Sequence, residues 1–209
     1  MDKSPDVRPQ GRPLILRRHR GFSLVELMMS IVLVAIGTAI ALPSFRDQVE
    51  KRQVTNGAEQ IASFINAAQG AAMKTNREVW VKWNRASADE WCVGANVDSP
   101  CDCTQDDACL IGGQEYVIDN SSAGDRDLLH AITGGGDDDA YGFDPVRGLV
   151  LDLTDAPVFE LRSNSDDYRL SLTVNSTGRV ALCSESAEHA VPGYEICPSS
   201  GDIQVAEAN

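Results

Sequence analysis

The residues of this sequence that could take part in chemistry begin at Gly21 and Phe22, which follow a cluster of basic side chains. Cleavage after Gly21 would create a positively charged amine on Phe22. Glu26 follows about one helical turn later, and it is the one ionisable residue between Phe22 and Leu42. A charged side chain in the middle of a membrane helix costs about 2.5–3.5 kcal/mol, so this carboxylate should have a partner. An amine on a neighbouring subunit could be that partner.

The apolar run from Phe22 to Leu42 is long enough to cross a membrane. As a helix its 21 residues cover about 30 Å, the thickness of a bilayer core. An ordinary signal peptide has a shorter apolar region, although Ala39-Ile40-Ala41 does offer small residues before a cut. A plain membrane anchor would not explain the acid. We therefore predict a basic leader over residues 1–21 and a transmembrane helix over residues 22–42.

Charge is distributed unevenly along the chain, whose net charge is −13. Residues 1–21 have more basic than acidic side chains, so the rest of the chain is strongly acidic. The positive-inside rule then predicts a cytoplasmic basic end and an acidic domain on the other side of the membrane. An acidic domain also argues against nucleic acid as a general partner.

All six cysteines follow the apolar run, on the side predicted to be exported. An even number of cysteines in an oxidising compartment predicts disulfides, and six cysteines allow 15 connectivities. A zinc site is the alternative, but zinc ligands usually come as closely spaced cysteine knuckles, which this sequence lacks. We therefore predict no metal.

Pro43 interrupts the apolar run, and we expect it to kink the helix near the membrane exit. Beyond it, apolar residues recur at steps of three and four between charged residues, which predicts an amphipathic helix over residues 43–75. Gly57 and Gly70 are expected weak points in this helix.

From residue 76 the apolar period drops to two, which indicates a β-rich head over residues 76–209. Asn175-Ser176-Thr177-Gly178 has the composition of a hairpin turn, and Gly134 to Asp139 that of a turn or loop. The expected strands cover residues 78–83, 90–93, 115–118, 128–132, 148–151, 158–161, 168–174 and 179–183.

Asp137-Asp138-Asp139 and Asp144 offer carboxylate oxygens, which are ligands of calcium. The run lacks the alternating ligand spacing of an EF-hand, so a solvated acidic loop is the favoured interpretation. The pair Asp166-Asp167 is interpreted in the same way.

No set of catalytic residues can be recognised in the sequence. His130 lies in an apolar strand and His189 in a loop rich in Glu and Ser, and no serine has a recognisable paired base. Trp80, Trp83 and Trp91 are expected to fill the core or a subunit contact. We predict that the protein is not an enzyme and uses no cofactor.

The stretch Gly21-Phe22-Ser23-Leu24-Val25-Glu26-Leu27-Met28 resembles the prepilin peptidase recognition site of the type IV pilin family. The resemblance implies cleavage after Gly21 and N-methylation of Phe22. It also implies that Glu26 pairs with a neighbour's amine during filament assembly. Pro43 matches the helix-breaking proline that is typical of this family. The implied partners are prepilin peptidase, the inner membrane, and other major and minor pilins.

Several later stretches resemble the GspH/FimT-type minor pilins. They are the helix end from Asn66 to Lys74, the segment from Tyr141 to Gly148, and the hairpin from Asn175 to Val180 followed by Cys183. The cysteine-rich loop after Trp91 is similar to that of the disulfide-bearing FimT/FimU members. The resemblance implies an α+β fold, in which a long N-terminal helix packs against a sandwich-like pair of antiparallel sheets.

We expect Cys183 to pair with Cys197 and to fix the C-terminal hairpin. A disulfide that closes a loop of this length contributes about 3 kcal/mol to the free energy of unfolding. The other four cysteines should pair among themselves. The sequential arrangement, Cys92–Cys101 with Cys103–Cys109, is the first guess. The crossed arrangement, Cys92–Cys103 with Cys101–Cys109, is the alternative.

Some FimT-type pilins bind DNA through a Gly-Arg-x-Arg element, of which this chain keeps Gly178-Arg179 but has Ala181 in the last position. Arg179 is therefore a weak DNA-binding candidate, since phosphate contacts need clustered cations. We expect a minor type IV pilin of FimT/FimU type that helps to start pilus assembly and lies near the tip. It would first sit in the bacterial inner membrane as a single-pass protein with a periplasmic head. The alternatives are an H-type minor pseudopilin of type II secretion and a DNA-binding minor pilin for natural transformation.

Overall fold

The computed structural model describes residues 21–85, 87, 90–122, 128–135, 139–151 and 155–198, without the side chains of residues 40–44, 135, 155 and 156. The chain divides into two compact units, residues 1–43 and residues 44–209. All of the predicted leader except Gly21 lies outside the described residues, as do Asp137 and Asp138 of the predicted acidic loop.

One helix, α1 (Leu24–Thr75), accounts for both predicted helical segments. In the second unit it buries an apolar stripe at the predicted steps of three and four residues, and the stripe packs in one core with residues of both large sheets. Asn76 follows with a φ of 53°, the left-handed conformation that commonly ends a helix. The fully buried residues of the stripe are Val54, Ala58, Ile61, Ile65, Ala68 and Ala72.

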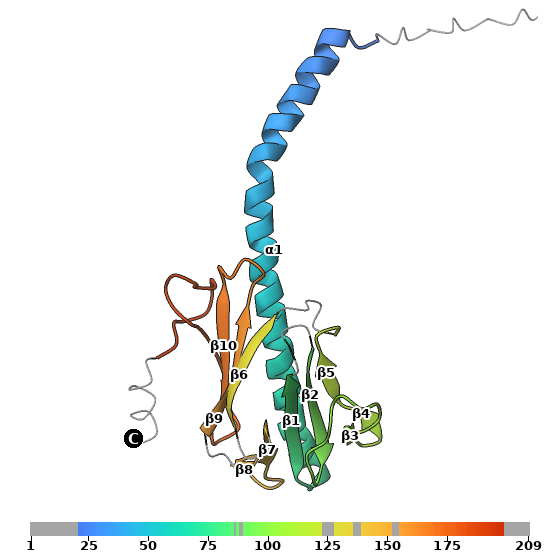
Figure 1. Ribbon diagram of the computed structural model, residues 1–209, viewed down its shortest axis with the longest axis vertical. Coiled ribbons are helices and arrows are strands. Elements are labelled where there is room, and N and C mark those ends of the chain that lie inside the picture. The colour runs from blue at the N-terminus through green and yellow to red at the C-terminus, as the bar shows by residue number, and fades with distance from the viewer. Residues whose placement is uncertain are drawn as a thin grey trace, which may run out of the picture. The chain divides into compact units, whose positions relative to one another are not determined.

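The strands form two large antiparallel sheets and a small one (Figure 1). The five-stranded sheet has the order β5 (Val117–Asp119), β2 (Trp91–Val97), β1 (Val79–Arg85), β7 (Ala140–Phe143) and β8 (Val150–Leu151). The four-stranded sheet has the order β11 (Val180–Ser184), β10 (Arg169–Val174), β9 (Asp155–Arg162) and β6 (Leu129–Gly135). The small sheet pairs β3 (Leu110–Ile111) with β4 (Gln114–Glu115). The α+β fold with a helix packed on antiparallel sheets is thus confirmed.

Strand β7 differs most from the sequence-based expectation, which placed no strand over this segment. All four of its residues are buried and it pairs with β1, matching Val79 with Phe143. Two further corrections are smaller. Strand β6 extends through Gly134 to Gly135, where a turn was expected, and the expected strand 115–118 is divided between β4 and β5.

Candidate functional site

The predicted processing site lies at the start of α1. Gly21, Phe22 and Ser23 precede the helix, and the amide of Leu27 donates to the carbonyl of Ser23 at 3.1 Å. Glu26 is the acidic residue of the first turn. A carboxylate there is stabilised by the positive end of the helix dipole. Phe22 is 81% exposed and Glu26 is exposed as well, so both are accessible from outside the chain.

The apolar side chains that follow Phe22 are uncovered in the single chain. Their exposed fractions range from 55% to 73%, and the chain buries none of them. Among the described residues, however, no helix meets the length and apolarity that crossing a membrane requires. The large apolar residues of this surface are Leu24, Val25, Leu27, Met28, Met29, Ile31, Val32, Leu33, Val34 and Ile36.

Pro43 lies within α1 and is the last residue of the N-terminal unit. Its side chain lies outside the described part of the chain. The predicted kink therefore stays a prediction.

Gln69 of α1 joins the two turns whose sequences resemble GspH/FimT motifs. Its Nε2 donates to the carbonyl of Gly148 at 2.8 Å and to that of Thr177 at 3.4 Å. Gly148 and Gly178 have φ values of 68° and 76°, and a Cβ on Gly178 would come within 2.6 Å of the Gly148 carbonyl oxygen. Glycine adopts both conformations without strain, and at Gly178 any Cβ would also clash with the backbone. Sequence reasoning found the turns and placed Gln69 in the family-like helix end, but it did not predict these contacts, because Gln69 is 79 residues before Gly148 in the chain.

The disulfide loop is crossed, and the sequential first guess, Cys92–Cys101 with Cys103–Cys109, is wrong. The structure pairs Cys92 with Cys103 and Cys101 with Cys109. Gly94 of β2 lies against the crossing, where a Cβ would overlap Cys109 Sγ and lie 2.9 Å from Cys103 Cβ. The loop therefore packs directly on the backbone of β2.

The C-terminal loop is closed by Cys183–Cys197, the pair that the sequence predicts. It packs on α1, because Val191 is 2% exposed and the Tyr194 hydroxyl donates to Glu59 Oε1 at 3.0 Å. Burial, followed by the hydrogen bond to Glu59, raises the pKa of Tyr194 to about 12.

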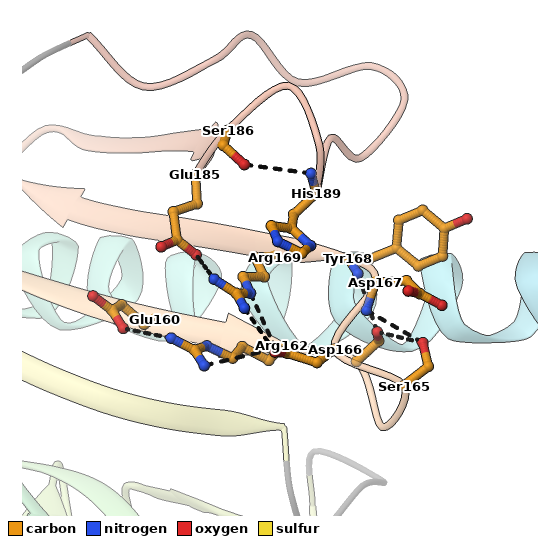
Figure 2. Close-up of polar contacts among 11 residues, drawn as sticks. Glu160, Arg162, Ser165, Asp166, Asp167, Tyr168, Arg169, Glu185, Ser186 and His189 are labelled. Atoms are coloured by element: carbon orange, nitrogen blue, oxygen red, sulfur yellow. Dashed lines mark hydrogen bonds and ion pairs between the residues drawn. The ribbon is translucent and has the colours of Figure 1, made fainter.

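Ion pairs join this loop to the turn between β9 and β10 (Figure 2). Arg169 lies between Asp166, at 2.6 Å, and Glu185, at 3.1 Å. Arg162 also approaches Asp166, at 3.6 Å, and Glu160, at 3.7 Å. The hydrogen bond from Arg169 lowers the pKa of Asp166 despite the opposing effect of burial. Asp166 is thus an ion-pair acceptor, whereas the sequence interpretation was a solvated acid.

The same turn contacts α1 near the start of the second unit. The hydroxyl of Ser165 donates to Glu50, and Lys51 Nζ lies 4.8 Å from the centre of the Tyr168 ring. Together with the loop contacts, these interactions fasten the four-stranded sheet to the helix.

Asp144, one of the acidic residues considered for calcium, instead stabilises the β7–β8 turn. Its Oδ1 accepts the amides of Val146 and Arg147 at 2.9 and 2.7 Å. Asp137 and Asp138 lie outside the described residues. Within the described ranges, no three His, Cys, Asp or Glu side chains come together as a metal site would require.

Arg179, the DNA-binding candidate, is exposed beside the glycine contact, as is Arg147 from the other turn. Ala181 is also exposed. Two arginines on neighbouring turns are fewer than the clustered cations that a phosphate backbone needs.

Two models of known protein families match this chain. The family model for the type II transport protein GspH matches residues 57–178, which is more than half of the chain. The chain belongs to the GspH family. A second model, for the prokaryotic N-terminal methylation motif, matches residues 16–42. These two matches confirm the GspH/FimT-type resemblance inferred from the sequence. Members of this family are pilin-like structural proteins.

The GspH-family chain is also similar, over part of its length, to proteins named as fimbrial proteins or pilins. It is 30% identical over 59 residues to a fimbrial protein of Pseudomonas aeruginosa, over 28% of this chain and 38% of the relative. It is 36% identical over 56 residues to the type IV major alpha-pilin of Moraxella bovis, over 27% of this chain and 35% of the relative. The chain thus spans less than two fifths of these relatives' length. No solved structure gives a significant match.

Proposed function

We propose that this chain is a minor type IV pilin of FimT/FimU type, a structural subunit that helps to start pilus assembly and is built into the pilus near its tip. The observation that carries the proposal is the uncovered apolar surface of α1, with Glu26 in its first turn. Such a surface needs a cover from outside the chain. The methylation motif over residues 16–42 and the pilin relatives favour membrane lipid first and neighbouring pilin helices later.

The proposed sequence of events begins in the bacterial inner membrane, with residues 22–42 spanning it once and the head in the periplasm. Prepilin peptidase then cleaves after Gly21, and the new amine of Phe22 is methylated. During assembly, Glu26 pairs with the terminal amine of a neighbouring pilin. An ion pair in apolar surroundings stabilises the filament because either charge alone would be costly there.

The test is Glu26→Ala in the native bacterium, with Glu188→Ala as the matched control because Glu188 is an exposed acid of the head. We expect Glu26→Ala to be cleaved normally but strongly depleted from sheared pili, and Glu188→Ala to be incorporated normally. Intact mass would report cleavage after Gly21, the added methyl group and the hydrogens lost to disulfides. Normal incorporation of Glu26→Ala would refute the proposed role of Glu26.

An H-type minor pseudopilin of type II secretion is the second candidate, because the matching family is described as the type II transport protein GspH. Deleting the gene separates the two candidates. Loss of surface pili with normal protein secretion supports the pilus, and the opposite result supports the secretion system. A DNA-binding role is supported only by the exposed Arg179 and Arg147. A gel shift of the protein with duplex DNA at low salt would be required to favour it.

A further inference from the structure

An open groove of about 460 Å³ lies between α1 and the β4–β5 segment. This volume is within the range of ligand-binding pockets in proteins. The rings of Phe64 and Tyr116 pack 4.9 Å apart and form its aromatic part. Polar side chains line it from both sides, and apolar residues complete the lining. The polar residues are Gln60 and Ser63 on the helix and Glu115 and Ser122 on the opposite side, and the apolar ones are Ala67, Val117 and Ile118.

The groove runs beside an open strand edge. Strand β5 ends the order of the five-stranded sheet, and among the described strands it pairs with β2 alone. The amide of Ala95 donates to the Tyr116 carbonyl at 3.0 Å, so Tyr116 turns its carbonyl toward β2. Because backbone groups alternate along an antiparallel strand, Val117 directs its N–H and C=O away from β2. Asp119 has the same direction, since its amide donates to Ser122 Oγ at 2.9 Å.

The surroundings of this edge are acidic and held in place. Residues 98–119 contain six Asp or Glu and no Lys, Arg or His. Asp98 is paired with Arg77, whereas Glu115 is exposed at the groove. The crossed disulfides fasten the backbone of the loop before β4, and Glu115 Oε1 accepts the amide of Asp107 in this loop at 3.4 Å, so this carboxylate is held near the groove before any partner binds.

We propose that this groove binds an extended segment of a partner protein, which adds beside β5 as a further strand and places Lys or Arg next to Glu115. Strand addition supplies main-chain hydrogen bonds through Val117, and the groove beside the edge supplies side-chain selection. The Phe64–Tyr116 pair suits an apolar side chain of the same segment. This proposal holds equally for a type IV pilus subunit and for a pseudopilin of type II secretion.

The probe is the peptide Gly-Lys-Val-Thr-Val-Lys-amide with fluorescein on its N-terminal amine, so that both Lys side chains stay charged, titrated into the full chain in detergent. A second peptide with Glu in place of both Lys is the charge control. We expect the Lys peptide to bind with roughly tenfold or greater preference over the Glu peptide, as measured by anisotropy. We also expect it to slow hydrogen exchange of the Val117 amide. No binding of the Lys peptide at about 1 mM would overturn the proposal.

Val117→Pro is the sharpest variant, because proline removes an N–H that the β2 ladder does not use and is tolerated on edge strands. We expect it to abolish peptide binding while the melting temperature and the three disulfides are kept. Undiminished binding by a folded Val117→Pro would overturn strand addition.

Charge reversal gives a second route if Val117→Pro fails to fold. Glu115→Lys should reverse the preference between the two peptides, whereas Glu188→Lys, an equal change at an exposed site in the C-terminal loop, should leave it unaltered. Equal effects of the two variants would overturn the specific role of the groove. Protection of the Val117 amide without peptide, increasing with protein concentration, would make a second copy the occupant and overturn it also.

Discussion

Two regions of α1 carry apolar residues but meet different surroundings. In the first turns the large apolar side chains are 55–73% exposed, whereas the stripe from Val54 to Ala72 is fully buried against the sheets. The first region is apolar all round, and a helix of that kind cannot be covered by a single face of a domain. The second needs only one face covered. The difference shows that the chain itself covers the apolar residues of α1 from Val54 to Ala72 and leaves those of the first turns uncovered.

The largest expected effect comes from truncating one isoleucine in each region. Ile65→Ala should lower the free energy of unfolding of the head by about 2–5 kcal/mol, because it leaves a cavity at a fully buried site. The matched variant Ile36→Ala, at a site 55% exposed, should leave that free energy nearly unchanged. Urea unfolding of the full chain, followed by tryptophan fluorescence, checks both. Equal losses would show that the first region is also covered within the chain.

Removing the disulfide Cys183–Cys197 tests whether the C-terminal loop helps to hold the second region of α1 in the fold. The double substitution Cys183→Ser with Cys197→Ser should cost about 3 kcal/mol, since the bond closes a loop of sequence separation 14. Tyr194→Phe removes only the hydrogen bond to Glu59 and should cost about 0.5–1.5 kcal/mol. If the double variant loses no more than Tyr194→Phe in the same urea experiment, the disulfide adds nothing to that contact.

The parts of this comparison that sequence reasoning predicted are those carried by neighbouring residues. The N-terminal motif is contiguous, and the buried stripe and most strands follow from periods of three to four and of two. β7 was missed because it has only four residues beside glycine and aspartate, and its burial depends on pairing with the distant β1. Burial from distant partners leaves little local signal.

The contacts of Gln69 and the disulfide pairing were less predictable, because they also depend on residues far away in the chain. Gln69 contacts turns 79 and 108 residues away, and a lone glutamine in a helix gives no sign of such contacts. The disulfide pairing could not be chosen because connectivity depends on which loop faces β2. Gly94, two residues after Cys92, was the available signal, since a strand glycine often marks a close approach of other atoms.

Two glycines, Gly57 and Gly70, lie in the second region of α1, where the stripe from Val54 to Ala72 is buried, and they test how tightly this region is packed. Gly57→Ala should destabilise the head by about 1–3 kcal/mol, because its Cβ would overlap the side chain of the buried Leu128. Gly70→Ala should instead stabilise it by about 0.5–1 kcal/mol, since nothing lies within 4 Å of its Cβ and alanine favours the helix. Thermal melts of both variants decide. A gain in stability for Gly57→Ala would show that Leu128 moves aside without cost.

The smallest effect concerns the ion pairs at the start of the covered region, where the β9–β10 turn meets α1. Hydrogen bonding from Arg169 lowers the pKa of Asp166, so the folded state binds this proton less readily than the unfolded state. The resulting stability is fully present above about pH 5 and is lost as the pH falls through the lowered pKa of Asp166. Asp166→Asn should therefore melt earlier than the wild type at pH 7, and the difference should shrink in acid. Asp167→Asn, at a neighbouring exposed acid for which the described residues provide no ion pair, is the control. A constant difference at every pH would mean that the asparagine changes the turn itself and not its charge.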